Sequence, residues 1–360
     1  MPVRAAPENK DGLYEAQLEK SSANELFSGL PQEVRSRLSD MGIDSPEYEK
    51  LSSLDTGTIL NQLGAMAGES SSSPLYSMTA CIGILLLCAV TEGFGAGGKK
   101  LDTVQNTVGS VCICAALIVP LCSTVSKTAE TLCGASGFML LYVPILTGLL
   151  VSSGSEVTGG SYYSAMMTAG NAVSLVSSKL LVPLMNVFLA LSVTSSLSPK
   201  MKLGSLCEAV YKIAKWLLTL VTSIFITVMS LNTLITSSMD NVTKKALKFS
   251  VSSFVPVVGG VLSEALTTFS GSLELLKSGA GVFVIIASAM IILPVLIECI
   301  LWRMSLFILT SVSEISGVTQ MTGIFKSVSK AVGMLTAMLF SVLTVFIIST
   351  VVVLLAGRSS

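Results

Sequence analysis

Two kinds of residue are scarce in this chain. Histidine is absent, and Asp, Glu, Lys and Arg together make up only 12% of the 360 residues, whereas a soluble domain carries roughly 25%. Without histidine the chain lacks the most common general base, proton-linked switch and metal ligand of proteins. Its basic residues form no clustered face of the kind that binds nucleic acid. The composition therefore argues against catalysis, metal binding and nucleic-acid binding.

Paired cysteines are missing as well. The chain has eight cysteines but no CxxC pair, and Cys112 and Cys114 project to different faces of a helix. Most of the eight lie in apolar runs, where cysteine behaves as a small hydrophobic residue. We predict that they pack, and we expect neither a metal nor any other cofactor.

Catalytic motifs are also absent or incomplete. Residues 93–100 nearly match a P-loop, but Lys100 replaces the hydroxyl that would bind magnesium, and the segment links two apolar runs. Beyond residue 74 the only aspartates are Asp102 and Asp240, both near predicted loops, so no aspartate pair is available for intramembrane proteolysis. No serine–lysine spacing singles out a dyad. We predict that the protein is not an enzyme and assign no catalytic residues.

Long apolar runs with almost no charge inside them are what the chain does contain. Hydrophobic residues make up 51% of it, and the mean hydropathy is +0.77. About 20 such residues in a helix match the ~30 Å hydrocarbon core of a bilayer, where a backbone amide finds a partner only within its own helix. The sequence predicts an all-α, polytopic helical membrane protein with about seven spans. The runs are 75–90, 104–122, 138–151, 180–194, 216–236, 279–302 and 331–356.

The chain divides into two parts by charge. Residues 1–74 carry a net charge of −6 and residues 75–360 a net charge of +6. The first part predicts a small region of amphipathic helices, which either lies on the membrane surface or packs on the membrane domain. Residues 69–74 predict a polar hinge into the first span. The first ten residues lack the apolar core of a signal peptide, so the chain either needs none or is numbered after its removal.

Lysines flank the 216–236 run on both sides. Lys212 and Lys215 precede it and Lys244 and Lys245 follow it, so the positive-inside rule does not place both flanks in the cytoplasm. Residues 240–278 are half apolar and rich in Ser and Thr, and they contain Pro256, Gly259 and Gly260. These features predict a re-entrant or interfacial segment within the membrane domain 75–360.

Prolines and small residues interrupt the apolar runs. Pro120, Pro144, Pro183 and Pro294 are predicted to kink their helices, because proline removes a backbone donor and clashes with the preceding turn. Small residues let helices approach closely in lipid, which favours a tight bundle or a homo-oligomer. They cluster at 134–137, 279–281, 287–289 and 333–337.

Ionisable residues in apolar surroundings are the candidate functional groups, because such groups are costly in a bilayer. Lys179 opens a span, Glu264 follows the proline–glycine segment, and Glu298 lies near Arg303 at the end of the 279–302 run. Glu298 and Arg303 are five residues apart, which is a poor helical pairing. One interpretation is an interfacial anchor with a snorkelling glutamate. The other is a polar conduit or a subunit contact.

Residues 211–360 resemble the stage III sporulation protein AE family of endospore-forming bacteria. The resemblance is carried by the stretch YKIAKWLLTLVTSIFITVMSLNTLITSSMDNVTKKALKF, the following VSSFVPVVGGVLSEAL, and two long apolar runs. The most specific block runs from Phe254 through Pro256, Gly259 and Gly260 to Glu264. The polar head followed by many spans extends the resemblance to the layout of the whole chain.

The resemblance implies a place and partners. Such proteins are expected in the mother-cell membrane that surrounds the forespore, as part of a secretion-like channel between the two cells. The implied partners are membrane lipid and the other proteins of the stage III sporulation A operon: an ATPase, small membrane proteins and ring-forming proteins. The rings meet stage II sporulation protein Q. The family is expected to begin with a cleaved signal sequence, which this chain does not show, and its removal would place residues 1–74 outside the cytoplasm.

Three functions remain open at this point. The first is the non-catalytic membrane core of that channel. The second is a stand-alone secondary transporter, and the third is a scaffold without a conduit of its own. Transporters often contain internal repeats with broken helices at equivalent places, and no convincing repeat is present here.

Overall fold

All regular structure in the described part of the chain is helical. The computed structural model describes residues 25–44, 55–93, 98–152, 156–197, 203–236 and 279–356. The elements are α2 (Glu25–Ser28), α3 (Gln32–Asp40), α5 (Thr56–Gly93), α6 (Gly98–Ser152), α7 (Glu156–Ala165), η1 (Met166–Gly170), α8 (Asn171–Val176), η2 (Ser177–Leu181), α9 (Val182–Leu197), α10 (Gly204–Thr236), α13 (Gly279–Ile315) and α14 (Thr319–Ala356). This confirms the predicted all-α class. The predicted segment 240–278 lies outside the described residues.

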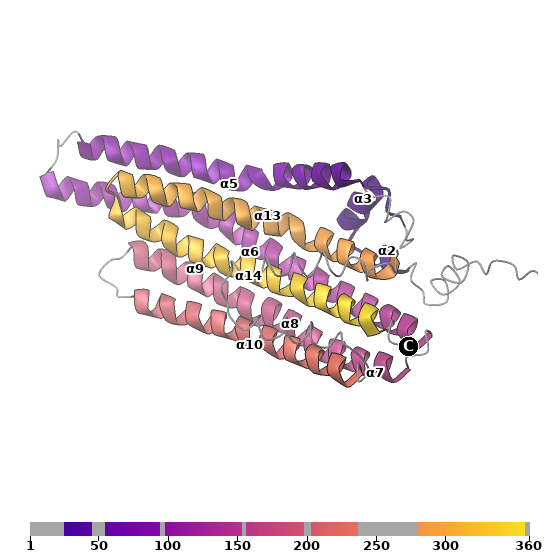
Figure 1. Cartoon of the computed structure of the whole chain (residues 1–360). Helices are drawn as coiled ribbons and strands as arrows, with labels where there is room; N and C mark the ends of the chain where they lie inside the picture. The colour runs from indigo at the N-terminus through magenta and orange to yellow at the C-terminus, as the bar shows by residue number, and fades with distance from the viewer. Residues whose placement is uncertain are drawn as a thin grey trace, which may run out of the picture.

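Six long helical rods, with α7 to α9 counted as one, lie side by side and alternate in direction (Figure 1). Each is long and apolar enough to cross a bilayer, so the chain is a multi-pass membrane protein. The hairpin of α13 and α14 forms the centre: α13 also packs on α5 and α6, and α14 packs on α6, α9 and α10. The edges of the bundle are α5 on one side and α10 on the other (Figure 1).

The seven predicted apolar runs fall on six rods because runs 104–122 and 138–151 share α6. The residues between them contain Lys127 and Glu130 but no proline, so nothing ends the helix there. At roughly 1.5 Å per residue the 55 residues of α6 extend over about 82 Å, more than twice the hydrocarbon thickness of a bilayer. Hydropathy therefore divides into two runs a stretch of chain that the backbone forms as one continuous helix.

The turn between α13 and α14 depends on Gly317. This residue has φ of +77°, a left-handed conformation that is cheap only for glycine. The amide of Gly317 donates to the carbonyl of Glu314, and the amide of Val318 donates to that of Ser313, both at 3.3 Å. This pattern is a Schellman motif, which satisfies carbonyls at the end of a helix. The central hairpin therefore closes in three residues.

The short N-terminal helices pack on the membrane domain. The ring of Phe27 lies 6.5 Å from that of Phe283 at the start of α13, and α3 also contacts α13. Of the two predicted arrangements, the described part of this region adopts packing on the bundle. The buried residues of its apolar stripe are Leu26, Leu30, Val34 and Leu38.

Arg37 connects α3 to the start of α5. Its guanidinium donates to Glu33 and to Glu69, each at 2.8 Å. Partial burial works against the charged form, but the two carboxylates outweigh it and raise the pKa of Arg37 above its ordinary value. Residues 69–74, predicted as a hinge, are helical because α5 continues through Pro74.

Prolines differ in their local effect. Pro120, Pro144 and Pro294 lie inside single continuous α-helices. Pro183 is instead the second residue of α9, which follows directly on the π-helical segment η2. The ring of a proline clashes with the carbonyl four residues earlier, which here is that of Lys179 within η2. A wider π-helical turn at that point relieves the clash.

A buried hydroxyl cluster joins three helices near the ends of α6 and α14. Ser349 on α14 lies 2.8 Å from the hydroxyl of Tyr142 on α6 and 2.7 Å from that of Tyr162 on α7. All three side chains are buried. Because a hydroxyl both donates and accepts, one serine satisfies two tyrosines in surroundings without water. The cluster sets the rotation of α7 against the central hairpin.

We predict that Tyr162→Phe destabilises the protein through the loss of this one hydrogen bond. The free energy of unfolding should fall by about 0.6–1.7 kcal/mol, the range measured for hydrogen bonds between membrane helices. Unfolding in mixed detergent micelles, followed by circular dichroism, measures the change.

The neighbouring tyrosine is the matched control. Tyr163 is 42% exposed, so Tyr163→Phe removes the same atom without a buried partner. Equal losses in the two variants would contradict the role of the hydroxyl cluster.

Candidate functional site

Glu298 lies inside the bundle with both carboxylate oxygens occupied. Oε1 accepts a hydrogen bond from the hydroxyl of Thr124 at 2.7 Å, and Oε2 accepts one from Nζ of Lys127 at 2.9 Å. The side chain of Glu298 is only 4% exposed. It therefore does not snorkel to an interface, which was one of the two interpretations from the sequence. Its carboxylate instead joins α13 to the middle of α6.

Trp302 extends this cluster by one turn of α13. Its indole Nε1 donates to Oγ1 of Thr124 at 3.1 Å, and Trp302 is fully buried. Thr124 thus accepts a hydrogen bond from the indole and donates one from its own hydroxyl to Glu298. We call Thr124, Lys127, Glu298 and Trp302 the charged cluster. Each polar group in it has a partner of the correct kind, as buried polar groups require.

The ion pair is asymmetric in its exposure. The side chain of Lys127 is 48% exposed, against 4% for Glu298. The carboxylate therefore depends on the lysine, whereas the lysine reaches the surface of the bundle, where Glu130 is also exposed. A charge held at the edge of an apolar bundle is available to water, to a lumen or to a neighbouring subunit.

The other predicted site residues are dispersed or undescribed. Arg303 is exposed on α13 and forms no ion pair with a described residue, so Glu298 pairs with Lys127 instead. Lys179 is exposed within η2. The remaining predicted residues, Phe254, Pro256, Gly259, Gly260 and Glu264, lie outside the described part of the chain.

Sequence analysis missed Lys127 and Thr124. Lys127 lies between two apolar runs and 171 residues before Glu298, in a segment interpreted as a connection. A buried carboxylate requires a cation, but the sequence does not show which lysine of the chain meets Glu298. No comparable signal marked Thr124.

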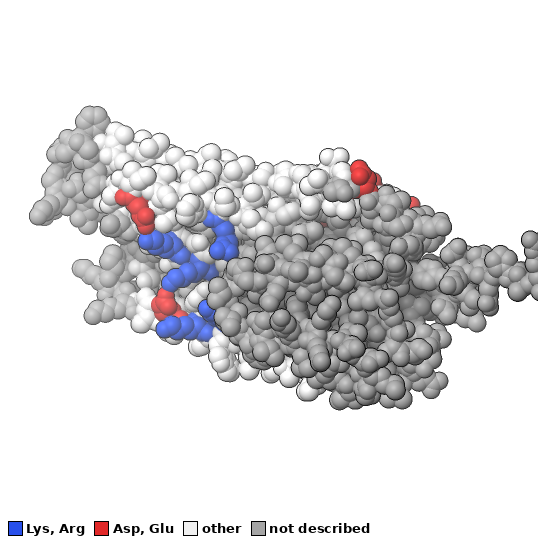
Figure 2. Space-filling view, in the orientation of Figure 1, with Lys and Arg blue, Asp and Glu red and all other residues white. Residues whose placement is uncertain are grey.

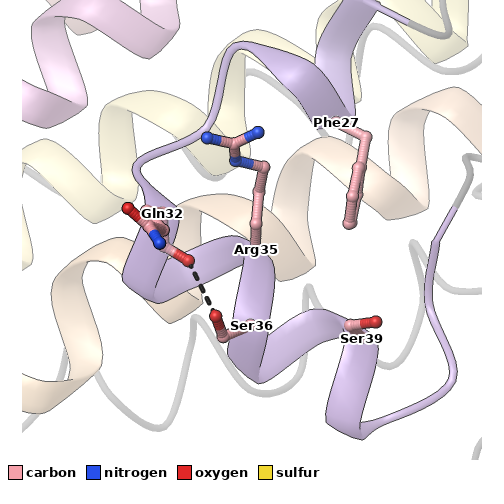
Figure 3. A pocket seen from close by; sticks show the side chains of 5 residues that line it. All are labelled: Phe27, Gln32, Arg35, Ser36 and Ser39. Atoms are coloured by element: carbon pink, nitrogen blue, oxygen red, sulfur yellow. Dashed lines mark hydrogen bonds between the residues drawn. The ribbon is translucent and has the colours of Figure 1, made fainter.

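An open depression of about 320 Å³ lies beside α3. Phe27, Gln32, Arg35, Ser36 and Ser39 line it (Figure 3), and the hydroxyl of Ser36 donates to the backbone carbonyl of Gln32 at 3.1 Å. The lining contains no acid–base pair. Within the described ranges, no group of three His, Cys, Asp or Glu residues could hold a metal ion.

Comparisons with known proteins agree on one family. The model of the family described as stage III sporulation protein AE matches residues 49–357. Stage III sporulation protein AE of Bacillus subtilis (strain 168) is 26% identical over 184 residues, which cover 50% of this chain and 46% of that relative. The aligned part therefore spans about half of each protein. No solved structure matches.

We predict that Lys127→Met destabilises the bundle more than Glu298→Gln. The first change leaves a buried carboxylate without its cation, a loss of about 3–5 kcal/mol for buried pairs. The second leaves a lysine that already reaches the surface. Unfolding free energies in lipid bicelles, combined in a double-mutant cycle, measure both losses and the coupling between the two residues.

The Lys326–Glu314 pair supplies the control. Its 2.8 Å separation is nearly the same, but its side chains are 60% and 54% exposed. Exposed pairs contribute about 0–1 kcal/mol, so Lys326→Met should cost far less. A loss as large as that of Lys127→Met would show that burial does not set the strength of the Glu298 pair.

Proposed function

Because the chain belongs to the stage III sporulation protein AE family, we propose that it is the non-catalytic integral membrane core of a secretion-like channel between mother cell and forespore. Its place is then the mother-cell membrane around the forespore. Its partners are the other products of the stage III sporulation A operon, through which it reaches stage II sporulation protein Q indirectly. The protein acts as a homo-oligomer.

One structural observation supports this role above the others: an ion pair whose carboxylate, Glu298, is the only charged side chain buried in the described part of the bundle. Charges are kept within membrane domains where passage or assembly needs them. The ion pair of Glu298 extends to the surface of the bundle through the half-exposed side chain of Lys127. In an oligomer that surface faces either a water-filled lumen or the adjacent copy. Both arrangements suit a channel component.

We predict that Glu298→Gln, introduced into the native chromosomal gene, lowers the yield of heat-resistant spores. Glutamine keeps the shape and the hydrogen bond from Thr124 but not the charge opposite Lys127. Glu314→Gln is the control, because it removes a carboxylate from an exposed pair and should leave the yield unchanged.

Two further measurements separate the rival functions. Co-purification of each variant with the operon partners from sporulating cells reports assembly, and late forespore gene expression reports passage. Intact assembly with altered passage supports a conduit. Lost assembly, with normal passage through the complexes that remain, supports a scaffold.

The third rival is tested with the purified protein. Ion-coupled uptake by this chain alone in liposomes would overturn the proposal in favour of a secondary transporter. Failure to associate with the operon partners at all would overturn it without favouring that rival.

A further inference from the structure

The outer edge of α10 combines positive charge, an exposed indole and an apolar stripe. Lys212, Lys215 and Trp216 lie within one turn of each other, and Trp216 is 64% exposed. Leu220, Ile224 and Leu231 continue the line and are also exposed. At about 100° per residue, Lys212, Trp216, Leu220 and Ile224 follow one ridge of the helix at spacings of four, and Leu231 lies close to that ridge. Lys215 projects on the other side of Lys212. We propose that this edge binds an anionic phospholipid, with the headgroup phosphate at the two lysines.

Glu208 interacts electrostatically with Lys212 as well as pairing with Lys330, so one carboxylate serves two lysines, and Lys215 forms no ion pair with a described carboxylate. Lys330 on α14 pairs with Glu208 and lies 6.0 Å from the centre of the Tyr211 ring. Lys326 pairs with Glu314. No such ion pair joins Lys212 or Lys215 to a residue of the described part. Their positive charge is therefore available to an external anion.

The two lysines also lie where charge ends along the bundle. Thr222 on α10 and Ser341 on α14 are 2.7 Å apart, and from that level to the described ends of both helices no residue is charged. Figure 2 shows Lys and Arg gathered with Asp and Glu in one region of this face. A boundary of this kind, with tryptophan beside lysine, is typical of the bilayer interface.

A phospholipid fits this edge better than a soluble anion or an acidic peptide. The phosphate contacts the ammonium groups, the glycerol region meets the indole, and an acyl chain lies along Leu220, Ile224 and Leu231. A free phosphate would leave the apolar stripe unused. The inference rests on the membrane fold and not on the channel role.

The two tryptophans of the chain make the inference testable by fluorescence. Trp302 is buried and Trp216 is exposed. The fluorescence of Trp216 is therefore obtained by subtracting the fluorescence of the Trp216→Phe variant from that of the full chain. The protein is reconstituted in phosphatidylcholine containing brominated phosphatidylglycerol or brominated phosphatidylcholine. Bromines near the carbonyl end of the acyl chain should quench Trp216 more strongly than bromines near the methyl end. Phosphatidylglycerol should be preferred by about fivefold per available lysine.

The Lys212→Gln/Lys215→Gln double variant should lose this preference and retain quenching by phosphatidylcholine. Lys326→Gln removes one charge that is already paired with Glu314, so it should retain the preference. Three results would overturn the proposal: no quenching by either lipid, stronger quenching from the deep bromines, or an unchanged preference in the double variant. Loss of the preference on adding inorganic phosphate would overturn the assignment to a lipid, because it would show a site for phosphate alone.

Discussion

Polar groups within a lipid-embedded bundle must find their partners in the protein, and this constraint shapes every helix contact described above. The backbone meets it by forming helices, since lipid offers no donor or acceptor. The side chains meet it at several contacts between helices, and two of these are buried clusters. Ser349 serves two tyrosines near the ends of α6 and α14, and Thr124 and Lys127 together serve Glu298 in the middle of α6. Apolar packing fills the space between these points.

The two clusters differ in what they allow. The hydroxyl cluster is closed, since its three side chains are all buried and neutral. The charged cluster is open on one side, because half of the Lys127 side chain reaches the surface. A closed cluster specifies how the helices pack, whereas an open one also offers a charge to the surroundings. This difference is why the functional proposal rests on Glu298 and Lys127 rather than on the tyrosines.

Much of the fold could be predicted from the sequence, because long uncharged runs have few structural solutions. Runs 216–236, 279–302 and 331–356 each lie within one observed helix. Helix ends were harder to predict: α6 and α13 continue through charged residues that hydropathy excludes from a span. Glu298 stood out as a carboxylate in an apolar run. Its partner did not, because the rotation of α6 against α13 decides which lysine meets it, and one sequence does not show that rotation.

The alternating directions of the helices determine which elements lie at the same end of the bundle. Helix α5 begins at the end of the bundle where α3 packs and where α14 finishes, whereas the turn at Gly317 lies at the opposite end (Figure 1). Because the described part of the chain has an even number of crossings, α3 and the end of α14 lie at the same end of the bundle. If the molecule were inserted in the opposite orientation, α3 and the end of α14 would move together to the other side of the membrane. The turn at Gly317 would move to the side that they left. A single marker on any one of these three elements therefore orients all of them.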